Sequence, residues 1–146
     1  MYCLVLRQLS PIQKGVQSAH ACMEYASKYK HSDDFNQYVA IDKTLIMLDG
    51  GISQELERIK ETLISNDIDF ASFNEPDIND CITCVCFLAN EQVYDRSLYQ
   101  SYKQYSDCNY EDFSNETELY NSWVEYIGGA KNATLISIIN GKKLSM

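Results

Sequence analysis

The most constraining feature of the sequence is a helix start at Ser10-Pro11-Ile12-Gln13, directly after a short apolar run. Ser10 can accept a backbone N–H bond at the helix start, and Gln13 can reach back to Ser10. Proline suits the first helical position because its missing N–H would have no partner there. These residues predict a helix over Pro11 to Tyr29. Since Tyr2 to Arg7 is apolar with valine and aromatic content, a strand is expected before this helix.

The predicted first helix has two kinds of side chain at helical spacing. Its apolar residues recur three and four apart and give one apolar face: Val16, Ala19, Met23 and Ala26. A polar row runs beside that face: Gln17, His20 and Glu24. This arrangement is typical of an amphipathic helix.

Three further apolar runs predict strands. Lys43 to Leu48 reads as a buried strand that ends at Gly50-Gly51, and Ile68 to Phe73 reads as a short strand. The turn-forming segment from Asn74 to Asp80 then leads into Cys81 to Leu88, a nearly continuous apolar run expected at the centre of a sheet.

A second helix is predicted between the strand at Lys43 to Leu48 and the strand at Ile68 to Phe73. Ser53 is a suitable N-cap and Asn66 a suitable stop. The apolar residues between them repeat at helical spacing: Leu56, Ile59, Leu63 and Ile64. The resulting β-α-β-α-β-β order predicts an α/β fold, a single domain with a mixed four-stranded sheet flanked by helices.

The C-terminal third predicts a helical region. Residues 94–126 hold most of the tyrosines among acids and amides, and two helices are expected there. The apolar residues between Asn132 and Gly141 fit a short capped helix, with a strand as the alternative because three of them are isoleucines. We therefore expect one domain over 1–146, with a core at 1–90 and a helical extension at 91–146.

Length and cysteine usage indicate the class of protein. A chain of 146 residues with 45% hydrophobic content fits one globular domain with a real core. Its six irregularly spaced cysteines resemble reduced core thiols rather than a disulfide framework, so we expect a cytoplasmic protein. The apolar start is six residues long, too short for a signal peptide or a membrane span, and no membrane partner is expected.

The charge balance limits the partners. A net charge of −9 opposes binding along extended nucleic-acid backbones, and therefore disfavours tRNA as a partner. The excess of acid lies mainly between Glu111 and Glu125, so the N-terminal half is closer to neutral. A small anionic ligand remains compatible with that half.

The cysteine-rich run Cys81-Ile82-Thr83-Cys84-Val85-Cys86 raises the question of a metal site. On a regular strand Cys84 and Cys86 share one face while Cys81 points to the other, so three thiolates would not converge. We expect buried core thiols, no metal and no cofactor.

The N-terminal ninety residues resemble the type II peptidyl-tRNA hydrolases in their element order and in one motif. The helix of that family carries Lys-Gly-Lys-x-x-x-Gln-x-x-His-Ala, and Gln17, His20 and Ala21 match it, while Gln13 stands at the second lysine and Lys14 is displaced by one residue. The family's Asp-Ala-Gly-x-Thr segment falls on residues 75–80 and is not matched.

The chain also resembles a divergent branch of this family found in tailed phages. The shared elements are Lys-Gly-x-Gln-x-x-His, beginning at Lys14, Glu-Pro-Asp at Glu75 to Asp77, and Gly128-Gly129. The resemblance implies the hydrolase-like fold, a homodimer and, for a phage protein, the host cytoplasm. The tyrosine-rich C-terminal region offers a surface for such a dimer, or its aromatic residues simply cover the sheet.

Each residue singled out by these patterns has a functional and a purely structural interpretation. Lys14 and the unpaired N–H groups of the first helical turn form a positive spot for an anion, or Lys14 is merely solvated. His20 takes part in chemistry, or is a half-buried histidine bonded to a backbone carbonyl. Glu75 and Asp77 with Asn79 hold a ligand's amino or hydroxyl groups, or simply form the turn.

Two functions therefore compete at the sequence level. In the first, a phage accessory protein binds a small nucleotide-like ligand, such as a host signalling molecule, in a pocket between the first helix and the 75–79 linker. Its expected ligand-binding residues are Gln13, Lys14, Gln17, His20, Glu75, Asp77 and Asn79. In the second, the chain is an active peptidyl-tRNA hydrolase with Lys14, His20 and Asp77 as catalytic groups.

Overall fold

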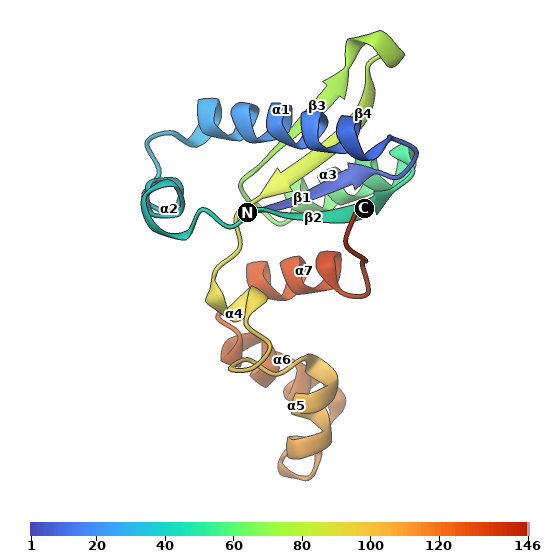
Figure 1. Cartoon of the computed structure of the whole chain (residues 1–146). Helices are drawn as coiled ribbons and strands as arrows, with labels where there is room; N and C mark the ends of the chain where they lie inside the picture. The colour runs from blue at the N-terminus through green and yellow to red at the C-terminus, as the bar shows by residue number, and fades with distance from the viewer. Residues whose placement is uncertain (146) are drawn as a thin grey trace. The chain divides into compact units, whose positions relative to one another are not determined.

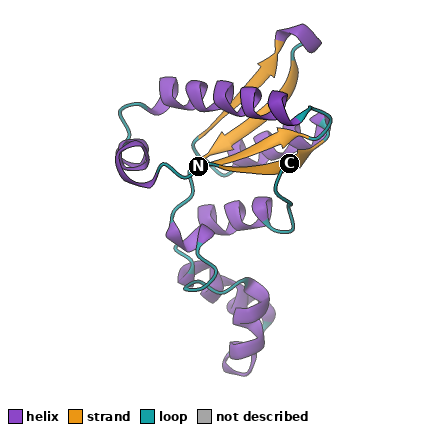
Figure 2. Cartoon of the chain, in the orientation of Figure 1, coloured by secondary structure: helices purple, strands orange, loops and turns teal. Residues whose placement is uncertain are grey.

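The computed structural model describes residues 1–145. Their contacts group them into two compact units. The first unit comprises Met1–Leu88 and the residues from Gly141 onward, and the second comprises Ala89–Asn140. The first unit contains all four strands of the sheet, and the second unit is helical, as the colouring in Figure 2 shows.

The first unit is built on a mixed four-stranded sheet (Figure 1). Its strands are β1 (Tyr2–Leu6), β2 (Ile46–Gly51), β3 (Phe70–Glu75) and β4 (Cys81–Phe87), in the spatial order β2-β1-β4-β3. The β1–β2 pair is parallel, whereas β1–β4 and β3–β4 are antiparallel. The predicted α/β class, the element order and the interior position of β4 are confirmed.

Two strands differ in their bounds from the prediction. β2 begins at Ile46 rather than Lys43 and includes Gly50 and Gly51, because Leu6 of β1 pairs with Gly51. β3 is shifted to Phe70–Glu75, since it pairs with β4 from Phe70 opposite Phe87 to Glu75 opposite Cys81. The connection between β3 and β4 is consequently short, with one 3₁₀ turn, η2 (Pro76–Ile78).

A register shift interrupts the pairing of β3 with β4. Phe73 pairs with Cys84 and Asn74 pairs with Ile82, so Thr83 has no partner of its own. This is a β-bulge, which turns the side chain of the extra residue and breaks the alternation of faces along the strand. The expected separation of the cysteines is confirmed: Cys84 and Cys86 belong to the core between α1 (Pro11–Tyr29) and the sheet, whereas Cys81 lies outside that core and lines a hollow with residues of α3 (Ser53–Ser65).

The two long helices of the first unit lie on opposite faces of the sheet, α1 in front and α3 behind (Figure 1). Helix α1 (Pro11–Tyr29) has the predicted bounds, and both hydrogen bonds of the Ser10–Gln13 capping box are present. Helix α3 (Ser53–Ser65) begins one residue earlier than predicted. Its N-cap is Ile52, whose N–H donates to the Glu55 carboxylate at 2.8 Å, and Asn66 is the C-cap as expected.

Helix α1 turns its polar side chains inward and its apolar row outward. Lys14, Gln17 and Tyr25 are buried, whereas Val16 and Met23 are exposed. This orientation follows from what lies beneath the helix, since the sheet offers the hydroxyl of Thr83 below its first half and small cysteine side chains below its second half.

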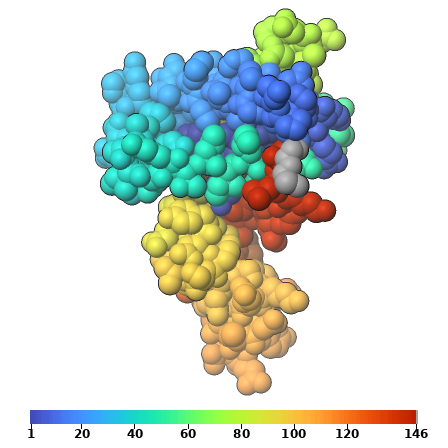
Figure 3. Space-filling model, viewed as in Figure 1, coloured from blue at the N-terminus to red at the C-terminus, as the bar shows by residue number. Residues whose placement is uncertain are grey.

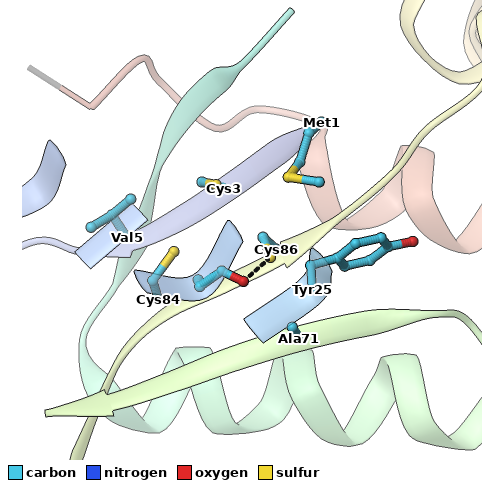
Figure 4. Close-up of a cluster of buried hydrophobic side chains, with 8 residues drawn as sticks. Met1, Cys3, Val5, Tyr25, Ala71, Cys84 and Cys86 are labelled. Carbon is cyan, nitrogen blue, oxygen red and sulfur yellow. Dashed lines mark hydrogen bonds between the residues drawn. The ribbon is translucent and has the colours of Figure 1, made fainter. Parts of the chain in front are cut away.

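The core between α1 and the sheet is rich in sulfur (Figure 4). Its buried members come from β1, β3, β4 and α1: Met1, Cys3, Val5, Ala21, Tyr25, Ala71, Cys84 and Cys86. The Cys86 thiol donates to the Ala21 carbonyl at 3.2 Å, and the Cys3 and Cys22 sulfurs lie 3.7 Å apart. Hydrogen bonding to Cys22 and Cys3, together with burial, raises the pKa of the Cys86 thiol.

The segment between α1 and β2 is partly helical. It forms α2 (Asp33–Gln37) and a π-helical turn, η1 (Tyr38–Asp42). Phe35 and Tyr38 explain its structure, because both pack against the sulfur-rich core and the Phe35 ring lies 5.9 Å from that of Tyr25.

The last described residues return to the sheet rather than continuing the helical region. Leu144 forms an antiparallel bridge with Leu48, and the Asp49 and Ser145 N–H groups donate to the Lys143 and Met47 carbonyls, each at 2.9 Å. The chain end thus adds hydrogen bonds to the outer edge of β2, and the helical region ends before Gly141.

The second unit contains four helices, α4 (Glu91–Tyr94), α5 (Tyr102–Asn109), α6 (Glu116–Tyr126) and α7 (Ala130–Ile139), and a 3₁₀ turn, η3 (Tyr110–Asp112). The predicted helices are confirmed, and the strand alternative for the last segment is wrong. Tyr102, Tyr120 and Trp123 form an aromatic cluster with ring centroids 5.3 to 5.6 Å apart. In the described part of the chain, none of the helices has the length and apolar character to cross a membrane.

Candidate ligand-binding site

A polar network joins the first half of α1 to the ends of β3 and β4. The Thr83 hydroxyl lies 2.9 Å from the Gln17 side-chain oxygen, to which it donates, and 3.2 Å from the Phe73 carbonyl. The Gln17 side-chain nitrogen in turn donates to the Glu75 carboxylate at 2.5 Å. Since Gln17 and Thr83 are buried and hydrogen-bonded, the network holds Glu75 in a defined position at the end of β3.

Lys14 lies one turn before Gln17 on the same inward face of α1 and is only 8% exposed. Burial of an ammonium group is costly unless hydrogen bonds or opposite charges compensate it. Its charge acts on Asp49, at the end of β2, where it contributes to lowering the pKa of that carboxyl group. A cation is therefore held close to the surface beside the Gln17 network.

Asp49 extends the polar patch to the carboxyl ends of the parallel strands. Its carboxylate accepts from Arg7 Nε at 2.8 Å and from the Gly51 N–H at 2.8 Å. Partial burial works to raise its pKa, but the bonds from Arg7 and Gly51 and the charges of Arg7 and Lys14 outweigh burial, and the pKa is lowered. Ligands of open α/β sheets commonly bind beyond such strand ends.

His20 is half-buried and packs against Phe73, with ring centroids 4.5 Å apart and planes tilted by 54°. Its Nδ1 atom is buried and has no hydrogen-bond partner among residues 1–145. The predicted half-burial of His20 is confirmed, and its Nδ1 atom does not make the predicted bond to a backbone carbonyl. The His20–Phe73 pair instead adds an aromatic surface next to Gln17.

The structure separates the predicted site residues into two groups. Gln17 contacts Glu75 directly, and Lys14 and His20 lie on α1 three residues before and three residues after Gln17. Gln13 is occupied in the helix cap, where its side chain accepts from the Ser10 N–H at 3.0 Å.

Asp77 and Asn79 stand apart from the Gln17 network. Both are exposed in the turn after β3, and Asn79 adopts a left-handed conformation with φ of 57°. Within the described residues, neither side chain forms a hydrogen bond or an ion pair with the network. Asp77 and Asn79 are therefore residues of the turn that joins β3 to β4.

Several contributing residues were not expected from sequence. Thr83 is the one hydroxyl-bearing residue in the apolar run of β4, and that contrast was an available signal. Phe73 and the Arg7–Asp49 pair carried no comparable signal, because their roles depend on which strands become neighbours.

A surface hollow of about 480 Å³ lies elsewhere, between α3 and the start of β4. It is lined by Ser53, Gln54, Glu57, Arg58, Glu61, Asp80, Cys81 and Ile82. The side chains of residues 1–145 include no group of three histidine, cysteine or acidic residues arranged to hold a metal ion. Cys84 and Cys86 belong to the core cluster, and Cys81 does not.

The arrangement defines an α/β protein with a compact polar patch: a buried cation, a positioned carboxylate, an amide and an aromatic pair. No protein-family model matches the chain, and no curated protein matches it either.

Proposed function

We propose that the chain is a ligand-binding protein that holds a small anionic, nucleotide-like ligand beside the sheet-facing side of α1. The observation that carries the proposal is the near-complete burial of Lys14 beside the bonded Gln17–Thr83–Glu75 network. A cation held in a polar, partly desolvated setting binds a phosphate more strongly than a solvated lysine does.

The neighbouring groups match the remaining parts of a nucleotide. Glu75 uses one carboxylate oxygen for Gln17, and its other oxygen can accept from a ligand's amino or hydroxyl group. The aromatic pair His20–Phe73 can take up a base by stacking. Because this contact area is small, the negative charge of the whole chain does not oppose it as it opposes a long nucleic acid.

The finer fold assignment belongs to the same proposal. The order β-α-β-α-β-β agrees with the element order of the type II peptidyl-tRNA hydrolases, and Gln17 and His20 stand on α1 at the motif positions. This likeness supports a divergent, phage-type relative of those enzymes that binds a ligand in the host cytoplasm. A host signalling molecule is one ligand of suitable chemistry.

Hydrolysis of peptidyl-tRNA is the second candidate, favoured by Lys14 and His20 standing on one helix. It would require Asp77 or His20 to orient water close to Lys14. Asp77 is exposed in the turn, and among residues 1–145 its carboxylate forms no ion pair with Lys14 or His20. We therefore rank binding first.

Calorimetry with adenosine monophosphate tests the proposal. We expect binding by the wild type, with adenosine and inorganic phosphate each binding more weakly. Lys14→Gln and Glu75→Gln should each reduce the affinity by about 1 to 3 kcal/mol, the value of a charge-assisted hydrogen bond. Lys60→Gln on α3, which removes a cation paired with Glu57 away from the patch, is the matched control and should leave affinity unchanged.

Two outcomes would contradict the proposal. One is an absence of heat from adenosine monophosphate at millimolar concentration, with the same result for guanosine monophosphate. The other is rapid turnover of peptidyl-tRNA by the wild type that is lost in Lys14→Ala and in Asp77→Asn, which would establish the hydrolase instead.

A further inference from the structure

Helix α1 exposes a continuous apolar stripe on the side turned away from the sheet. Ile12, Val16 and Met23 are 82%, 46% and 65% exposed. With Ala19 and Ala26 they stand at alternating spacings of four and three residues, the pattern by which one helix packs along another. Helix α1 lies on the visible face of the first unit in Figure 3 (blue).

The charges of α1 are all placed away from this stripe. At about 100° per residue, Lys14, Glu24 and Lys28 project roughly 120° to 200° from the middle of the stripe. The outward half of the helix consequently has no charged side chain. The solvent-facing side of a surface helix normally carries charged residues. The packing of α1 on the sheet does not explain why its outward side has none.

We propose that the α1 stripe is the contact surface for a second copy of the chain, with the two α1 helices antiparallel about a two-fold axis beside Ala19. That register places large side chains opposite small ones. Ile12 of one copy meets Ala26 of the other, Met23 meets Gly15, and Ala19 meets its own counterpart. The face is thus complementary to itself, as a two-fold interface must be.

The absence of charge on the stripe is compatible with a second copy at this face. Two chains of net charge −9 repel each other over most of their surface, and the uncharged outer half of α1 is where their approach costs least. A strongly basic partner would find no carboxylate on the stripe to pair with. The proposal is independent of the ligand site, because the ligand-binding groups lie on the inward side of α1.

Light scattering of the full chain tests the interface. We expect the wild type to have twice the chain mass of 16.8 kDa at high micromolar concentration. Ala19→Glu and Ala19→Lys should each give a monomer, since the axis brings like charges together, and a mixture of the two variants should restore the dimer. Ile64→Glu changes an equally exposed apolar residue on α3 and should remain dimeric.

Cross-linking tests the antiparallel register. In a Cys108→Ser background, oxidised glutathione should join an Ile12→Cys chain to an Ala26→Cys chain, two thiols losing their hydrogens as the oxidant becomes two glutathiones. A parallel pair would instead join two Ile12→Cys chains. Circular dichroism checks that the variants are folded.

Three results would overturn the proposal. The first is a monomeric wild type, which includes the case where the chain's own second unit covers the stripe. The second is a dimer that persists in both folded Ala19 variants, and the third is loss of the dimer in Ile64→Glu.

Discussion

At the scale of single residues, Gln17 and Thr83 illustrate how a buried polar pair can organise a site. Gln17 could not lie against the sheet without partners for its oxygen and nitrogen, because an unpaired buried amide is costly. Thr83 and Glu75 supply these partners from two different strands. The contacts that compensate the burial of Gln17 also position the Glu75 carboxylate at the end of β3.

Removing the Thr83 hydroxyl should therefore destabilise the first unit. Thr83→Val keeps the shape of a fully buried side chain but takes the donor away from Gln17 and from the Phe73 carbonyl. We expect the free energy of unfolding to fall by about 1 to 3 kcal/mol, the cost of an unsatisfied buried polar group. Urea denaturation followed by far-UV circular dichroism measures it.

The control for this change is Thr62→Val. The Thr62 hydroxyl is exposed on α3 and donates only to the Arg58 carbonyl of its own helix, so its loss should cost less than about 0.5 kcal/mol. An equal loss of stability in both variants would refute the role given to Thr83.

At the scale of secondary structure elements, the contact of α3 with the sheet depends on a glycine. A Cβ built on Gly50 would lie 2.5 Å from a Leu56 methyl group, 2.9 Å from the Val5 nitrogen and 3.0 Å from the Leu4 carbonyl carbon. Two of these three neighbours are backbone atoms of β1, which cannot move aside as a side chain can. Gly50 thus allows β2 and α3 to approach β1 closely.

Gly50→Ala should accordingly reduce the free energy of unfolding by about 1 to 3 kcal/mol, the usual range for overpacking. Adding Leu56→Ala should not restore it, because the contacts with the β1 backbone remain. Gly15→Ala is the comparison in α1, where nothing lies within 4 Å of the new Cβ. In dilute solution it should stabilise by about 0.5 to 1 kcal/mol through helix propensity, and the opposite ranking would contradict the packing described.

At the scale of the whole molecule, the chain has two hydrophobic cores, and the unit that holds the first core is formed by two separate stretches of sequence. The helical unit Ala89–Asn140 is inserted between β4 and the last residues, which pair with β2. Leu4 and Val85 belong to the core of the first unit, whereas Leu119 and Trp123 are buried in the second. Separate cores of this kind commonly have separate stabilities.

The single tryptophan allows this to be tested. Trp123 lies in the second unit, so its fluorescence reports on that unit, while far-UV circular dichroism reports on both. Leu4→Ala should destabilise the first unit by about 2 to 5 kcal/mol and lower the dichroism midpoint, with a smaller change in the fluorescence midpoint. Leu119→Ala should mainly lower the fluorescence midpoint. Identical shifts by both probes in both variants would show one cooperative unit.

Much of the fold followed from local sequence signals. The Ser10–Gln13 cap determined the start of α1, because capping is decided by residues within one turn. The apolar run of β4 indicated an interior strand, since a strand covered on both faces needs apolar residues at every position. The sequence likewise indicated Lys14, Gln17, His20 and Glu75 as site residues, the first three from one short motif on the first helix.

Tertiary structure alone decided which way the elements face. The apolar row of α1 points outward, and helical periodicity could not reveal this, because it identifies a face without saying what lies opposite. The bulge at Thr83 exists only through the pairing of β3 with β4, and the hydroxyl of this residue bonds to Gln17. Sequence thus determined the elements and most site residues, and long-range pairing determined their contacts, because register and burial are properties of two segments together.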